Sequence, residues 1–163
     1  MNAQELLVGL ETLLVSTLKD FAFPAPPDAP SERDVTVYLH DVPEECSSQF
    51  PLVVIRWLSG ITEGEGASQY AEDTVLLYLC VYAGNQREAG LLTANLLDAL
   101  RGTLWMERVI SRKFCLQGSI KAHIPEPQQQ INSFHVATIQ ATYRYGIPVQ
   151  PVGNIKGESN GRY

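Results

Sequence analysis

The chain has 163 residues, of which 45% are apolar and 18% charged, and its formal net charge is −6. This composition is typical of one globular domain and argues against disordered, fibrous and basic nucleic-acid-binding proteins. No apolar run reaches the length that spans a bilayer, and the three cysteines, Cys46, Cys80 and Cys115, form no CxxC pair, which favours a reducing compartment over a disulfide framework.

The charge is distributed unevenly along the chain. Residues 1–73 carry thirteen Asp and Glu against three Lys and Arg, a balance of −10, whereas residues 74–163 carry five against nine, a balance of +4. The plain interpretation is that the two halves neutralise one another within one fold. The alternative is that acidic and basic faces meet between protomers in a head-to-tail ring, because heterologous contacts need two different, matching surfaces.

An amphipathic helix is predicted over about residues 2–19. Asn2 followed by Glu5 resembles a capping box at its start. Leucines then recur at spacings of three and four, which is the pattern of one apolar helical stripe: Leu6, Leu7, Leu10, Leu13, Leu14 and Leu18.

The segment after this helix is rich in proline. Residues 23–30 predict an extended spacer, because proline lacks an amide donor, and a short strand is expected at 35–39. Residues 52–58 are continuously apolar and β-rich, which predicts a strand covered on both faces. Residues 61–69, glycine-rich and acidic, predict a loop that leads into a long central strand at 70–82.

A second helix and two further strands are predicted in the second half of the chain. A helix is predicted from Asn85 to about Leu104, with Glu88 three residues after its expected cap. Strands are predicted at 114–124 and 134–145, and strict alternation in the second of these indicates that one of its faces meets solvent.

These elements predict an α+β fold. We expect a single domain over 1–147, with a mostly antiparallel sheet of about five strands packed with two helices and a long protruding hairpin. From Pro148 onward, proline, glycine and asparagine replace the periodic pattern, so residues 148–163 are expected to form an extended C-terminal tail.

Motifs for catalysis, cofactors or metals are missing from the sequence. The histidines lie outside GxSxG and HExxH patterns, and no Cys/His spacing matches a zinc site: they are His40, His123 and His135. Acidic pairs at Glu63/Glu65 and Glu72/Asp73 are possible acid and base pairs, but carboxylates in a loop are usually solvated. We expect no enzymatic activity, cofactor or metal; an enzyme with an unrecognised site and a binding module using the proline-rich spacer are the alternatives.

The order of the elements resembles that of the tail terminator, or tail-completion, proteins of long-tailed bacteriophages. The resemblance covers about residues 1–147, and its specificity lies in order and spacing, because no single residue is diagnostic. It rests on the leucine-rich helix 6–18, the run 51–56 before the acidic segment 63–66, the helix 91–104, and the Pro125-Glu126 loop before 134–145.

The resemblance implies a structural virion protein. Proteins of this family form a homohexameric ring that caps the tail tube, stops its elongation and provides the interface to the head-side connector. The implied partners are further copies of the chain, the tail tube protein and the connector or neck proteins, with no membrane, and DNA passes through the lumen without specific binding. The implied location is the neck region of the virion tail, after synthesis in the host cytoplasm. A head-completion or neck protein is the alternative.

Two groups of residues become candidate contacts under this resemblance. Negative charge in a lumen would repel DNA, so carboxylates are expected to face the lumen or the tube: Glu63, Glu65, Glu72 and Asp73. A second group is expected to contact neighbouring subunits or the connector: Arg108, Arg112, Lys113, Pro148 and Tyr163.

Overall fold

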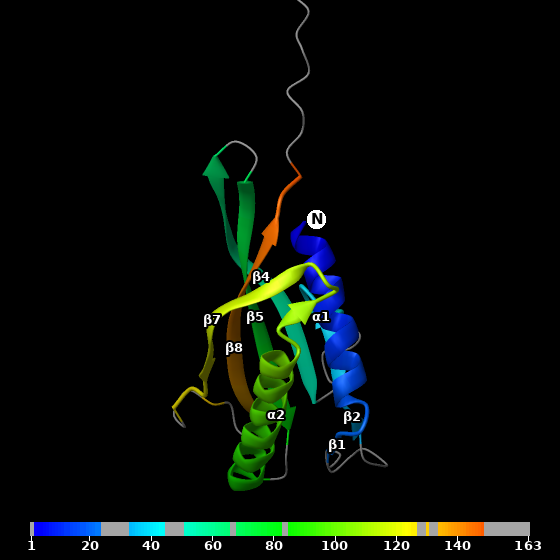
Figure 1. The fold of residues 1–163 in the computed structure, drawn as a ribbon. Coiled ribbons are helices and arrows are strands. Elements are labelled where there is room, and N and C mark those ends of the chain that lie inside the picture. Colours follow the sequence, from blue (N-terminus) through cyan, green and yellow to red (C-terminus); the bar gives the residue numbers. More distant parts are fainter. Residues whose placement is uncertain are drawn as a thin grey trace, which may run out of the picture.

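A computed structural model describes residues 2–23, 33–44, 51–65, 68–82, 85–126, 130 and 134–148. The elements, in chain order, are α1 (Ala3–Leu18), β1 (Ala22–Phe23), β2 (Arg33–Asp34), β3 (Thr36–Leu39), β4 (Leu52–Glu65), β5 (Ser68–Tyr82), α2 (Gln86–Met106), β6 (Val109–Ile110), β7 (Phe114–His123) and β8 (Phe134–Gly146) (Figure 1). The predicted tail beyond Pro148 and most of the proline-rich spacer lie outside the described residues.

One mixed sheet organises the molecule. Its six strands run in the order β3-β4-β5-β8-β7-β6, and β1 and β2 form a separate antiparallel pair. The predicted α+β class is confirmed, and β5 is central as expected, because β4 and β8 flank it along almost its whole length. Two details differ from the prediction. The sheet gains β6, which is too short to show an alternating pattern, and β3 pairs with β4 in parallel.

Both predicted helices form, and their caps explain where they begin. The side-chain oxygen of Asn2 accepts a hydrogen bond from the amide of Glu5 at 2.9 Å, and Asn85 does the same for Glu88 at 2.9 Å. These contacts satisfy amides that have no partner inside the helix. Five leucines of the predicted stripe on α1 are buried, and Leu13 is partly buried.

The helices cover one face of the sheet (Figure 1). Along β5, the side chains from Ala71 to Val81 alternate between buried and half-buried positions, with the inward ones packed under α1 and α2. On β4, Leu52–Ile55 are all buried, as predicted, but the coverage predicted for residues 56–58 is wrong, because Trp57 and Leu58 are exposed. Exposure begins at Arg56, because β4 continues past the end of β3 from this point.

The loop predicted at residues 61–69 is wrong. β4 continues to Glu65, with Glu63 opposite Tyr70 in the ladder and Gly64 opposite Gln69. The glycines that indicated a loop are accommodated in a strand because β5 supplies the backbone partners, and Gly64 has a φ of 122°, which glycine adopts without steric cost. The result is the predicted protruding hairpin, built as a continuous ladder (Figure 1).

Candidate functional site

The outer edge of β4 is open over most of its length. β3 pairs only with Leu52–Ile55, so within the described part of the chain no strand pairs with the outer side of β4 from Arg56 to Glu65. Backbone amides and carbonyls on such an edge can bond to a strand of another chain. The ladder to β5 also shifts register between Trp57 and Ser59, which makes Leu58 the extra residue of a bulge.

Large apolar side chains are exposed along this same edge. Trp57 is 46% exposed, Leu58 49% and Ile61 51%. The register pairs Trp57 with the inward-facing Val75 and Ile61 with the outward-facing Glu72, so these two side chains lie on opposite faces beside the open edge. Exposed apolar residues on both sides of an unpaired strand edge suit contact with another chain. These residues were not predicted from the sequence, although a Trp-Leu pair directly follows the buried apolar run.

Asp73 lies inside the protein, which corrects its placement at a lumen or tube face. Its side chain is 5% exposed, and it accepts hydrogen bonds from Trp57 Nε1 at 3.0 Å and from the Tyr145 hydroxyl at 2.8 Å. Burial, followed by the hydrogen bond and the negative charge of Asp73, raises the pKa of Tyr145 to about 12. The burial of Asp73 could have been predicted from the sequence, because residues two apart on a strand face the same side and Asp73 therefore faces inward with Val75 and Leu77.

Two of the remaining acidic candidates, Glu63 and Glu72, form part of a network across three strands. The Tyr70 hydroxyl on β5 donates to Glu63 on β4 at 2.6 Å, and Arg144 on β8 forms an ion pair with Glu72. The Arg144 guanidinium also lies over the Tyr70 ring, 4.5 Å from its centroid. The hydrogen bond from Tyr70 to Glu63 raises the pKa of Tyr70, and the bond to Glu72 raises that of Arg144.

This network changes the expected charge of the hairpin. Arg144 neutralises Glu72, so Glu63 is the exposed acidic side chain that the described residues leave at this end of the hairpin. Glu65 ends β4, and its side chain lies outside what the structure describes. Of the four predicted carboxylates, Glu63 and Glu65 therefore remain candidates for contact with a partner.

The basic candidates lie together in the connection from α2 to β7. Arg108 stacks on the exposed Trp105, with its guanidinium carbon 4.7 Å from the ring centroid. Arg112 adopts a positive φ of 58° in the turn between β6 and β7, and Lys113 forms an ion pair with Glu5 of α1 at 3.4 Å. All three are exposed. Pro148 is also exposed, after the end of β8, and Tyr163 lies outside the described residues.

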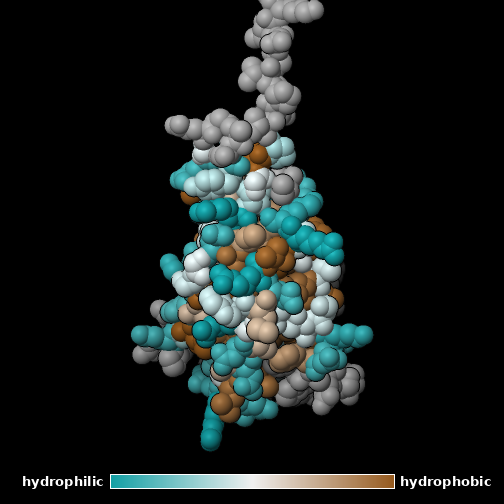
Figure 2. All heavy atoms as spheres, viewed as in Figure 1, coloured by the Kyte–Doolittle hydropathy of each residue, from teal (hydrophilic) through white to brown (hydrophobic). Residues whose placement is uncertain are grey.

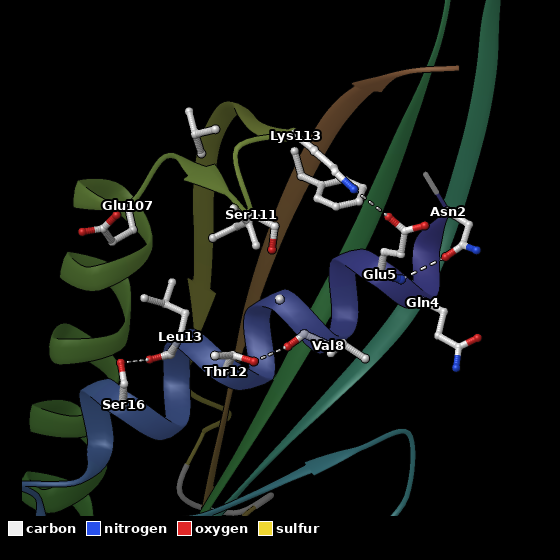
Figure 3. A pocket seen from close by; sticks show the side chains of 14 residues that line it. Asn2, Gln4, Glu5, Val8, Thr12, Leu13, Ser16, Glu107, Ser111 and Lys113 are labelled. Atoms are coloured by element: carbon white, nitrogen blue, oxygen red, sulfur yellow. Dashed lines mark hydrogen bonds and ion pairs between the residues drawn. The ribbon is translucent and has the colours of Figure 1, made fainter. Parts of the chain in front are cut away.

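A groove runs between α1 and this connection (Figure 3). It has a volume of about 770 Å³ and is open along one side. Gly9 sets its width, because a Cβ there would lie 2.7 Å from both Ile110 Cγ2 and Ser111 Oγ. The apolar lining comes from both sides of the groove: Val8, Leu13, Val109, Ile110 and Phe114.

The groove lies on the face that carries the helices. Figure 2 shows hydrophobic residues gathered in the middle of this face, with polar residues around them. Val8 is 45% exposed and Val109 50% exposed, so an apolar part of the lining meets solvent.

The described residues contain no group of three or more His, Cys, Asp and Glu placed to hold a metal ion. Burial raises the pKa of the Cys80 thiol to about 11, which makes it a poor nucleophile at neutral pH. No helix in the described segments is both long and apolar enough to cross a membrane.

Comparison with known proteins gives a weak likeness to a solved virion structure. No protein-family model matches the sequence, and no curated protein matches it. Among solved structures, a chain from the virion of a native gene transfer agent particle is similar, with a TM-score of 0.38 and 15% identity over 69% of this chain and 79% of that chain. A likeness at that TM-score carries no argument about fold or role.

Proposed function

We propose that this chain is a structural virion protein that closes into a homohexameric ring on the end of a phage tail tube. There it stops elongation of the tube and provides the interface to the head-side connector. The observation that carries the proposal is the open edge of β4 with Trp57, Leu58 and Ile61 exposed beside it. Such an edge is suited to binding another chain.

The opposite end of the sheet offers a second open edge. β6 pairs only with Phe114 and Cys115 of β7, so among the described residues no strand covers the outer side of β7 from Gln117 to His123. A ring needs two different surfaces on each subunit, and repeated head-to-tail contacts close when the rotation between subunits allows it. The two edges of the sheet supply such a pair of surfaces.

Charge differs between the two halves of the chain. Lys121 is exposed on the β7 edge, which belongs to the more basic half, whereas β4 belongs to the acidic half. The difference follows the imbalance along the sequence, −10 over residues 1–73 and +4 over the remainder. Opposite charges on two surfaces guide their encounter and select their register more than they strengthen the final contact.

The hairpin is the part of the subunit that we assign to the tube or lumen. Glu63 and Glu65 keep the role suggested for them, since negative charge at a lumen discourages DNA from binding as it passes. The partners are then further copies of the chain, the tail tube protein and the connector or neck proteins. The protein would be made in the host cytoplasm and would reside in the neck region of the virion tail.

Light scattering coupled to size-exclusion chromatography, followed by negative-stain imaging with and without tail tubes, tests the proposal directly. We expect rings, or particles bound at tube ends. Ile61→Lys places a charge beside the β4 edge and is expected to abolish both. Leu91→Lys is the matched control, because Leu91 is 59% exposed on α2 and belongs to neither edge strand. A chain that stays monomeric in the presence of tubes would refute the proposal.

A phage that lacks the protein separates the terminator from its nearest alternative. Loss of a terminator yields tails of uncontrolled length. Tails of normal length that fail to join heads would identify a head-completion or neck protein instead.

A further inference from the structure

We propose that the groove between α1 and the β6 segment is the docking site for the C-terminal segment of the same chain, residues 149–163. The groove is apolar, open and unfilled by any described residue. Docking of this segment goes beyond the ring described above and does not depend on it. The position of the segment, its reach and its composition each support the proposal.

The chain leaves the sheet directly beside the groove. The Tyr145 ring, near the end of β8, packs edge-on against the Phe114 ring, with centroids 5.0 Å apart, and Phe114 lines the groove. Ile147 donates its amide to the Gln69 carbonyl at 3.0 Å, which fixes the exit point. Figure 1 shows the end of β8 beside the first turn of α1, where the groove begins.

The length of the segment suits the groove. Along α1 the lining extends from Asn2 to Ser16, a distance of about 21 Å at the helical rise. Residues 149–163 span at most about 50 Å when fully extended, so the segment can reach every part of the groove. Because the segment is tethered beside its site, its effective concentration there is of millimolar order, and weak contacts suffice to hold it.

The apolar residues of the segment have a spacing that fits a narrow groove. Val149, Val152 and Ile155 recur every third residue. A polyproline II helix has three residues per turn and therefore aligns such side chains along one edge. Pro148 and Pro151 favour that conformation. The aligned edge matches the strip formed by Val8, Leu13 and Val109.

The charges are also compatible. The ionisable groups that line the groove are Glu5, Glu107 and Lys113, with Lys113 already paired to Glu5. The segment carries Lys156 and Arg162 against Glu158. Attraction between the net negative side chains of the lining and the net positive side chains of the segment favours docking at low ionic strength and weakens as salt is added.

Docking in the groove would unite the predicted contact residues on one surface. Lys113 lines the groove, and Arg108 and Arg112 belong to the same connection between α2 and β7. The segment would extend this surface from Pro148 to Tyr163.

Methyl NMR on the full chain and on a chain ending at Pro148 tests the proposal. The shorter chain keeps every residue of the buried core, which ends at Tyr145, and unchanged methyl shifts of Leu77 and Ile139 would verify its fold. We expect the Val8, Leu13 and Val109 methyl shifts to differ between the two chains. A synthetic peptide of residues 149–163, added to the shorter chain, should move these shifts toward their full-chain values.

A matched pair of variants makes the result specific. Val8→Lys places a positive charge in the apolar part of the groove, which the positive side chains of the segment would also oppose, and should weaken binding of the peptide about tenfold or more. Val15→Lys changes a valine on the same helix that is 53% exposed but outside the groove, and should leave binding unchanged. Identical groove shifts in both chains, with no response to the peptide, would overturn the proposal. If the groove methyl shifts of the full chain change only as its concentration is raised, the groove binds the segment of a second copy. That result would also overturn the proposal.

Discussion

The indole Nε1 of Trp57 donates a hydrogen bond to the carboxylate of Asp73 at 3.0 Å, across the ladder between β4 and β5. The other oxygen of that carboxylate accepts from the Tyr145 hydroxyl on β8 at 2.8 Å. The buried carboxylate of Asp73 on β5 therefore links this strand to both of its neighbours, β4 and β8. The same hydrogen bond fixes the position of Trp57, which is one of the exposed apolar residues at the β4 edge proposed for assembly.

Replacement of Asp73 should destabilise the fold. Asp73→Ala removes the acceptor for two donors, and we expect a loss of about 2 to 4 kcal/mol in the free energy of unfolding. Asp73→Asn retains one acceptor and should cost less. Urea unfolding measures both, with Glu63→Ala as an exposed control whose effect should stay near zero. Equal losses for Asp73→Ala and Glu63→Ala would contradict the role assigned to the buried carboxylate.

Gly60 should tolerate no side chain. A Cβ at this position would lie 2.3 Å from Asp73 Oδ1, so Gly60→Ala must displace the carboxylate and is expected to cost about 1 to 3 kcal/mol. Gly102→Ala is the matched control, because nothing lies within 4 Å of its Cβ position and it falls within α2. There alanine should stabilise the protein by about 0.5 to 1 kcal/mol. The same urea experiment compares the two, and a neutral Gly60→Ala would disprove the close contact.

Stability should fall at alkaline pH. Burial and the neighbouring Asp73 raise the pKa of Tyr145 from 10.0 to about 12, so the folded state holds this proton more tightly than the unfolded state. The resulting contribution is complete below pH 10 and is lost as the pH rises toward 12. Unfolding free energies across this range should fall less steeply in Tyr145→Phe than in the parent chain. Burial also raises the pKa of Tyr143, but this residue is present in both proteins and affects them equally. If the free energy of unfolding falls with the same slope in both proteins, Tyr145 makes no such contribution.

Charge reversal on the hairpin should impair docking without unfolding the protein. Glu63→Lys combined with Glu65→Lys is expected to change stability by less than about 1 kcal/mol, since exposed charges contribute little. Binding at tube ends and infectivity should decrease. Asp98→Lys combined with Glu126→Lys gives the same change in net charge at two other exposed sites. If the hairpin variant keeps full binding and infectivity, these carboxylates have no role at the tube.

The Asn85 cap of α2 should contribute measurably to the free energy of unfolding. The Asn85 side chain accepts the amide of Glu88 at 2.9 Å, and Asn85→Ala is expected to cost about 1 kcal/mol. Asn85→Asp supplies an equivalent acceptor and should retain most of the stability in thermal or urea unfolding. Similar losses in both variants would rule out the cap as the cause.

The helices could be predicted because their signals are local. The leucine stripe from Leu6 to Leu18 and the caps at Asn2 and Asn85 each lie within one helix, and the structure places all of them as predicted. The end of β4 could not be predicted in the same way. Gly60 and Gly64 indicate a loop when only their neighbours in sequence are considered, yet β5 holds them in a ladder.

The surfaces proposed for assembly depend on contacts between distant segments. An edge exists only where a neighbouring strand ends, and it is the length of β3 that leaves β4 open from Arg56. The groove likewise requires that α1 approach β6 closely, which Gly9 permits. Neither feature has a signature within its own stretch of sequence.

The sequence alone determined the class of fold, the two helices, most of the strands and the imbalance of charge, because periodicity, capping and composition depend on residues close together in the chain. Tertiary structure decided which polar groups remain available to contact a partner. It buried Asp73 beneath Trp57 and Tyr145 and neutralised Glu72 with Arg144. The physical reason is that burial and ion pairing are set by the strand that lies alongside a residue, and for β5 that strand is β8, which the chain supplies only after α2 and β7.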